Sequence, residues 1–317
     1  MEKIEHKYVQ VNGLNLHMAE IGSESSTAVV FLHGFPEIWY SWRHQMIAVA
    51  EAGYRAIAPD YRGYGLSDPP PEPEKTSFMD LLADLLALLD ALALSKVFLI
   101  GKDFGAAVVS MFTVLHQDRV LGFVTLGVPF MPPRPTPPTH HQNLPQGFYI
   151  SRWKEPGRAE ADFGRFDPKT VVRNVYILFS KSEIPIASEN QEIMDIVDPS
   201  TPLPSWFTEE DLSTYGALYE KSGFRTALQV PYRSFLTKLD IQDPKVDVPA
   251  LLIMGEKDYV LKFTGMEEYI RSGTVKSFVP NLEIKFMPQG THFVQEQSPE
   301  EVNGLILNFL TTLPRVT

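Results

Sequence analysis

The chain has 317 residues, of which 44% are hydrophobic, enough for one large α/β domain with an insertion or for two domains. Its net charge of −11 and its lack of a basic run argue against a nucleic-acid partner. The absence of cysteine excludes a disulfide framework and a thiolate metal site. No apolar run is long enough to span a bilayer and the charged first residues do not resemble a signal peptide, so we expect a cytoplasmic protein.

The first part of the chain predicts strands that alternate with helices. Residues 7–22 alternate apolar and polar side chains around Asn12-Gly13, a dipeptide typical of a tight β-hairpin turn. Strands are expected at 27–32, 54–58, 97–100 and 120–129, and helices at 41–51, 77–92 and from 106 onward. This alternation predicts an α/β fold whose central sheet is mostly parallel and covered by helices on both faces.

The pattern changes at Phe130. A proline-dense linker, residues 131–142, leads into residues 144–243, where short helical stretches and aromatic side chains replace the buried strands. Near the end of the chain, Ser298 and Glu301 predict a capping box, with proline in the first turn of the last helix. We therefore expect a first core segment (1–129), an inserted helical cap (130–245) and a second core segment (246–317), with strands at 249–258 and within 282–293.

The segment Gly101-Lys102-Asp103-Phe104-Gly105 joins a predicted buried strand to an apolar helix. Small residues two positions on either side of a central side chain are typical of a nucleophile elbow, a sharp turn that lifts one reactive group above the sheet. Here the central residue is Asp103, where most such elbows carry serine. With a reference pKa of about 3.9, an aspartate is already ionised at neutral pH and can attack carbon without a base.

Two more polar residues follow predicted strands. Asp258 ends the stretch PALLIMGEKD, and His292 follows EIKFM through the turn Gln289-Gly290-Thr291. Each alone also fits an exposed turn aspartate or a loop histidine. Together with Asp103 they stand in the order nucleophile, acid, histidine, which is the order of the α/β-hydrolase triad, and catalytic groups gather where parallel strands end.

The chain resembles the epoxide hydrolase branch of the α/β-hydrolase superfamily, and plant soluble epoxide hydrolases in particular, over essentially its whole length. The resemblance rests on VNGLNLHMAEIG, HGFPE, YRGYG, GKDFGA, GEKD and GTHFVQEQ in the expected core and on FYISRWKEPGRAEADF, LPSWFTEEDL and PYRSF in the expected cap. It implies that Tyr149 and Tyr232, in the cap, hydrogen-bond to the epoxide oxygen as the ring opens.

The implied reaction has two stages. Asp103 attacks an epoxide carbon and forms an ester, and water activated by His292, which Asp258 orients, then hydrolyses that ester to release a vicinal diol. The backbone N–H groups of Phe35 and Phe104 are expected to form the oxyanion hole. The reactants are a small-molecule epoxide and water, no metal or organic cofactor is required, and the protein is expected to be a monomer or a homodimer.

The elbow departs from the family pattern GHDWG at two positions, with Lys102 in place of histidine and Phe104 in place of tryptophan. We expect the stem of Lys102 to lie against the sheet and its ammonium to pair with a carboxylate. Phe104 removes an indole N–H that a haloalkane dehalogenase would use to hold halide, and an acyl esterase would need serine at position 103. A dehalogenase-like hydrolase and a non-enzymatic ligand-binding member of the superfamily remain the alternatives.

Overall fold

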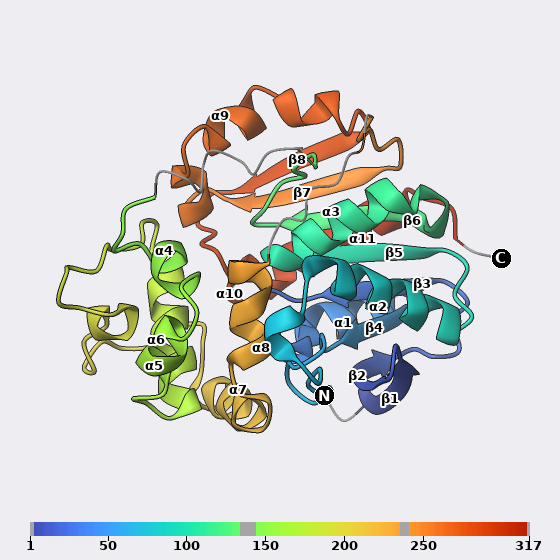
Figure 1. The fold of residues 1–317 in the computed structure, drawn as a ribbon. Helices are drawn as coiled ribbons and strands as arrows, with labels where there is room; N and C mark the ends of the chain where they lie inside the picture. The colour runs from blue at the N-terminus through green and yellow to red at the C-terminus, as the bar shows by residue number, and fades with distance from the viewer. Residues whose placement is uncertain (1–2, 134–143, 235–240, 242, 316–317) are drawn as a thin grey trace.

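The computed structural model describes residues 3–133, 144–234, 241 and 243–315. Within these residues, eight strands form one sheet in the order β1-β2-β4-β3-β5-β6-β7-β8 (Figure 1). The β1–β2 and β2–β4 pairs are antiparallel, whereas every other pair is parallel, so the expected mostly parallel sheet is confirmed. The strands are β1 Glu5–Val11, β2 Leu14–Ile21, β3 Ala28–Leu32, β4 Arg55–Pro59, β5 Val97–Lys102, β6 Val120–Leu126, β7 Ala250–Gly255 and β8 Leu282–Met287.

The N-terminal hairpin and the central strands follow directly from the sequence. Val11 pairs with Leu14, which leaves Asn12 and Gly13 as a two-residue turn. Both have positive φ, 49° and 83°, as a type I′ turn requires, so the predicted hairpin is confirmed. Every residue of β3 and β5 is buried, which accounts for their unbroken apolar sequence.

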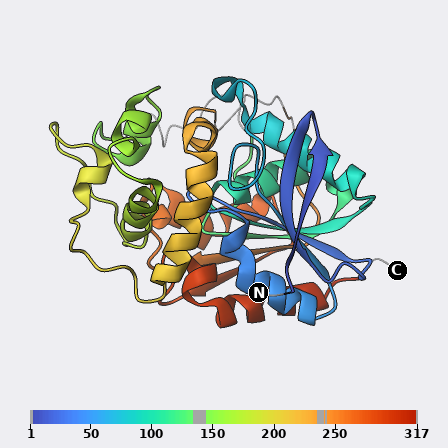
Figure 2. The same cartoon turned by 90° about the horizontal axis from the view of Figure 1, so that it is seen from below.

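Helices cover both faces of the sheet. Figure 2 shows α1 and α11 on one face, while α2 and α3 lie on the other. The helix expected at 41–51 begins as a 3-10 turn, Trp39–Trp42, before α1 continues it. The helices of the core are α1 Arg43–Glu51, α2 Phe78–Ala91, α3 Phe104–Leu115, α9 Met266–Arg271, α10 Val294–Gln297 and α11 Pro299–Thr311.

The predicted capping box of the last helix is wrong. Pro299 does occupy the first turn of α11, but Ser298 makes no side-chain capping bond. The Ser298 N–H instead donates to the carbonyl of Val294, at 2.9 Å, because α10 runs directly into α11. That backbone donor is therefore already satisfied, so Glu301 has no reason to turn back toward it.

Between β6 and β7, the regular elements among described residues 127–133, 144–234, 241 and 243–249 are all helical, and none of these residues adds a strand to the sheet. Its helices gather beside the sheet, with α7 between the core and the group α4–α6 (Figures 1 and 2). Most of the proline-dense linker falls outside the described residues. The helices are α4 Tyr149–Trp153, α5 Arg158–Phe163, α6 Pro168–Phe179, α7 Glu209–Ser222 and α8 Arg225–Leu228.

Local signals explain where the two longest of these helices begin. Asp167 caps α6 by accepting the backbone N–H of Thr170 at 2.9 Å, and Pro168 fills the first turn. Thr208 and Asp211 form a capping box at the start of α7. The aromatic side chains of α6 and α7 then pack against one another beside the core.

Candidate active site

The elbow after β5 forces Asp103 into an unusual backbone conformation. Its φ and ψ are 54° and −127°, a region in which a non-glycine residue costs about 1–3 kcal/mol. The turn also brings backbones too close for side chains at its flanks. A Cβ on Gly101 would lie 2.4 Å from the Gly105 carbonyl oxygen, and one on Gly105 would lie 2.3 Å from the Leu32 carbonyl oxygen. The two glycines therefore permit the turn that presents Asp103.

The two carboxylate oxygens of Asp103 face different groups. Oδ1 accepts the Phe35 N–H at 3.1 Å, and Oδ2 lies 3.5 Å from His292 Nε2. Burial opposes ionisation, but His292, Lys102 and the N–H of Phe104 outweigh it and hold the pKa of Asp103 below its ordinary value. Asp103 is thus an ionised carboxylate with one oxygen at backbone donors and the other beside an imidazole.

His292 is held from behind by Asp258. Its Nδ1 lies 2.9 Å and 3.0 Å from the two Asp258 carboxylate oxygens, one of which also accepts the Val260 N–H at 2.9 Å. This contact places a ring hydrogen on Nδ1 and points Nε2 toward Asp103. Burial and the positive charge of Lys102 lower the pKa of His292, but the carboxylates of Asp258 and Asp103, which stabilise the imidazolium, more than offset them, so the pKa lies above its ordinary value.

The two tyrosines singled out in the sequence come together from different parts of the helical segment. Tyr149 opens α4, Tyr232 lies beyond α8, and their ring centroids are 6.1 Å apart. The Tyr232 ring is also 5.4 Å from the ring of Phe35. Burial, reinforced by the charge of Asp103, raises the pKa of both phenols far above neutral pH. Both therefore remain protonated and can donate hydrogen bonds.

Tyr259 is a third phenol at this site that the sequence reasoning missed. Its hydroxyl lies 3.2 Å from the Tyr149 hydroxyl, and its ring lies 4.7 Å from the His292 ring. Its position directly after Asp258 was the only signal in the sequence. It links the tyrosine of the helical segment to the histidine of the core.

The turn that carries Phe35 is braced by two buried side chains. His33 Nδ1 donates to the Gly34 carbonyl at 2.9 Å, and burial lowers the pKa of His33 to about 4. Glu37, which the sequence reasoning missed, accepts the Gly34 N–H at 3.0 Å and the side-chain amide of Gln295. Burial raises the pKa of Glu37 to about 7. An acid within the apolar stretch GFPEIWY was the signal for it.

The expected carboxylate partner of Lys102 is wrong. The side chain is fully buried, yet Nζ has neither a hydrogen-bond partner nor a carboxylate within ion-pair distance among the described residues. Nζ lies 5.4 Å from the centroid of the Phe293 ring. Phe104, the other departure, packs against the rings of Tyr61 and Tyr64 at 5.3 Å and 6.1 Å.

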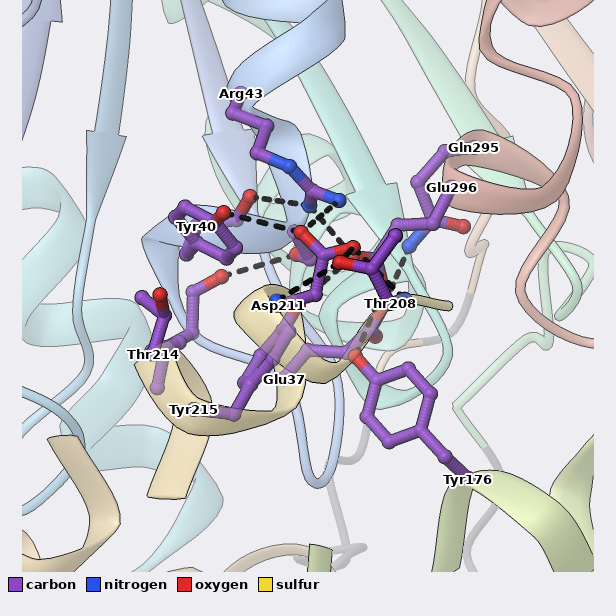
Figure 3. A network of polar contacts seen from close by, with 12 residues as sticks. Glu37, Tyr40, Arg43, Tyr176, Thr208, Asp211, Thr214, Tyr215, Gln295 and Glu296 are labelled. Atoms are coloured by element: carbon purple, nitrogen blue, oxygen red, sulfur yellow. Dashed lines mark hydrogen bonds and ion pairs between the residues drawn. The ribbon is translucent and has the colours of Figure 1, made fainter. Parts of the chain in front are cut away.

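A buried polar network joins α10, which follows His292, to the helical segment (Figure 3). Glu296 accepts hydrogen bonds from Arg43 at 2.6 Å, Tyr176 at 2.8 Å and Tyr215 at 3.1 Å. The second terminal nitrogen of the Arg43 guanidinium, Nη2, donates to Asp211, at the start of α7, at 2.9 Å. One guanidinium therefore ties α10 of the core to α7 across the interface.

We expect Arg43→Met to destabilise the protein by about 3–5 kcal/mol, because it leaves Glu296 and Asp211 as buried carboxylates without their cation. Urea unfolding followed by circular dichroism measures this. Arg225→Met is the matched control, since Arg225 pairs with Glu74 on the surface, with the two side chains 68% and 57% exposed. That control should lose no more than about 1 kcal/mol. Equal losses in the two variants would contradict the role given to Arg43.

Comparison with known proteins defines the class first. The alpha/beta hydrolase fold family matches residues 27–299, which contain all the strands from β3 to β8 together with Asp103, Asp258 and His292. The chain is 39% identical to "Epoxide hydrolase 2" of Siraitia grosvenorii, with 98% of this chain and 99% of the relative covered. It is 35% identical to "Epoxide hydrolase A" of Mycobacterium tuberculosis, with 97% of each covered.

Solved structures agree. A crystal structure of an epoxide hydrolase from Vigna radiata superposes with a TM-score of 0.90 at 36% identity, covering 98% of this chain and 99% of that one. The chain is therefore a hydrolase of the α/β-hydrolase fold that belongs to the epoxide hydrolase family. None of the helices in the described part of the chain has the length and apolar character needed to cross a membrane.

Proposed function

We propose that this enzyme converts epoxides into vicinal diols through a covalent ester on Asp103. The observation that carries the proposal is that the two oxygens of this carboxylate have different neighbours. Oδ1 accepts the Phe35 N–H, and Oδ2 faces His292 Nε2. An ionised carboxylate so placed is a nucleophile with a hydrolytic base already in position. Membership of the epoxide hydrolase family supports the choice of substrate class.

In the first step, Oδ2 of Asp103 attacks an epoxide carbon, and the bond from that carbon to the ring oxygen breaks. Charge develops on an oxygen that stays in the substrate, so it needs a proton or strong hydrogen bonds. Tyr149 and Tyr232 supply them, and one gives its proton to the new hydroxyl. The product of this step is a hydroxyalkyl ester on Asp103 with one tyrosinate.

In the second step, water attacks Cγ of Asp103 while His292 takes one of its protons. The oxyanion forms at Oδ1, where the Phe35 and Phe104 N–H groups stabilise it. Collapse breaks the bond between Cγ and the ester oxygen, and the imidazolium protonates that oxygen as the diol leaves. The second proton of the water restores the tyrosine, so the balance is epoxide plus water to diol.

Residues 130–245 are proposed to act as the cap, because the helices within them carry both tyrosines. The reactants are proposed to be a small-molecule epoxide and water, and the setting a cytoplasmic monomer or homodimer. A screen of styrene-type and fatty-acid epoxides for diol formation tests the function. Turnover of alkyl halides in preference to every epoxide would overturn it.

We expect Tyr149→Phe and Tyr232→Phe each to slow ring opening about 10- to 1,000-fold, the range for loss of one transition-state donor. Because two phenols share the developing charge, the double variant should nearly eliminate ring opening. Substrate binding should weaken less, since these hydrogen bonds strengthen only as the C–O bond breaks. Pre-steady-state burst kinetics on both singles and the double measure the effect.

Tyr8→Phe is the control for these variants, because the Tyr8 side chain is exposed on β1. It should open epoxides at the parent rate. A double variant that also retains the parent rate would reduce Tyr149 and Tyr232 to packing residues and would favour dehalogenation as the activity.

A further inference from the structure

Lys102 is the least explained buried group next to the candidate nucleophile. It is the last residue of β5, it precedes Asp103, and none of its surface is exposed. Among the described residues, its Nζ has no hydrogen-bond partner. Burying an ammonium without a direct partner costs several kcal/mol, so a fold retains one only where other groups offset that cost.

The surroundings of Gly127 show where this ammonium lies. A Cβ built on Gly127 would be 3.3 Å from Lys102 Nζ, 3.1 Å from Asp258 Oδ2 and 3.5 Å from His292 Cε1. The ammonium, the carboxylate and the imidazole therefore surround one point, although Nζ is not close enough to Asp258 for an ion pair. Lys102 thus lies beside the acid–histidine pair.

Three titratable groups respond to a positive charge at Lys102, namely the acids Glu37 and Asp103 and the base His292. The Asp258 carboxylate also faces the same point as the ammonium. The charge of Lys102 lowers the pKa of Asp103 and of Glu37, which favours their carboxylates. It also lowers the pKa of His292 and so opposes the strong pull of Asp258 toward the imidazolium.

We propose that Lys102 is a positioning residue of the triad, whose buried positive charge keeps Asp103 ionised before ring opening and keeps His292 neutral once the ester has formed. This proposal rests on the ester mechanism above. Without such a charge, the Asp258 carboxylate would favour the imidazolium form of His292 in the ester, and an imidazolium cannot accept a proton from water.

The expected effect has a definite sign. Ester hydrolysis requires neutral His292, so its rate rises with pH through the pKa of that residue. In Lys102→Met that pKa rises, and the acidic limb of the profile moves to higher pH. We expect a shift of about one pH unit, which makes hydrolysis about tenfold slower on the acidic limb and leaves the alkaline plateau unchanged.

Single-turnover hydrolysis of the ester, followed by acid quench and intact-protein mass spectrometry between about pH 5 and pH 9, measures this profile. Lys96→Met is the matched control, since it removes the same charge from an exposed position just before β5. The proposal predicts that only Lys102→Met moves the limb. An unmoved limb, a shift to lower pH or an equal loss at every pH would overturn it.

Ester formation in the parent protein distinguishes failure of this proposal from failure of the proposed function. If the parent never forms an ester on Asp103, the proposed function fails. If the parent forms and hydrolyses the ester but Lys102→Met keeps the parent profile, only the role of Lys102 fails.

Charge restoration gives a second test. The chain has no cysteine, so Lys102→Cys introduces a single thiol. Alkylating it in the unfolded chain with 2-bromoethylamine and refolding restores an ammonium of nearly the lysine length. The acidic limb should return to the parent position, and a limb that stays with Lys102→Met would contradict the proposal.

Unlike Arg43, Lys102 has no ion-pair partner among the described residues that its removal would leave unpaired, so Lys102→Met should fold. Should these variants not fold, ¹⁵N NMR of the lysine side chains in the parent decides the question. A slowly exchanging buried ammonium at neutral pH supports the proposal, whereas a neutral amine at Lys102 overturns it.

Discussion

Asp103→Ala should abolish diol formation, lowering kcat by about 10⁴-fold or more, while leaving the protein folded. The carboxylate of Asp103 is the nucleophile whose oxygen forms the ester bond, and neither Tyr149 nor His292 can replace it. The backbone of the elbow depends on Gly101 and Gly105 rather than on the Asp103 side chain, so unfolding temperature should change little. Asp118→Ala, at an exposed acid, is the control and should retain parent activity.

Isotope labelling tests the same prediction in the parent protein. After one turnover in ¹⁸O-labelled water, label should appear in the Asp103 carboxylate, and the diol should carry unlabelled oxygen. The reason is that the diol keeps the oxygen that Asp103 contributed, while water replaces it at Cγ. A first-turnover diol that carries solvent oxygen would mean that water attacks the epoxide directly.

His292→Gln should stop the reaction after ring opening. Only the second step needs an activated water, and His292 Nε2, which lies 3.5 Å from Asp103 Oδ2, is the base in position to supply it. We expect ester hydrolysis to slow by about 10²- to 10⁴-fold, the range for loss of a general base. Ring opening should survive, so the enzyme should accumulate heavier by one substrate.

Mass spectrometry of a digest should place that added mass on the peptide that contains Asp103. Asp258→Asn should slow the same step less completely, because it leaves the imidazole present but poorly oriented. His116→Gln, at the end of α3, serves as the control and should leave no adduct. Normal substrate binding without any adduct in His292→Gln would count against His292 as the base.

Most of the candidate site could be anticipated because its signals are local. Glycines at 101 and 105 predict a sharp turn, and the backbone distances show why no larger residue fits there. Asp258 and His292 each follow a buried strand, and parallel strands end at one edge of a sheet, so their meeting with Asp103 follows from topology. Tyr149 and Tyr232 needed the resemblance to a family, because nothing local marks them among the other aromatic residues.

Two predictions were wrong because they used local sequence alone, whereas the outcome depended on residues that contact the site only in the folded protein. The capping box at Ser298 fails because α10 ends there and uses the same backbone donor. The ammonium of Lys102 lacks the carboxylate expected for it, and the nearby buried acid Glu37 is instead engaged by the N–H of Gly34 and the side-chain amide of Gln295.

The sequence by itself determined the α/β layers, the elbow at Asp103 and the order of the triad, because hydrophobic periodicity and glycine positions act through neighbouring residues. Only the tertiary structure decided which charged side chains lie close enough to interact. Arg43 and Glu296 stand 253 positions apart in the chain, yet they form one of the bonds that join the core to the helical segment. Lys102 likewise meets His292 only in the fold, because the electrostatic field at a buried group depends on distance through space and not on separation along the chain.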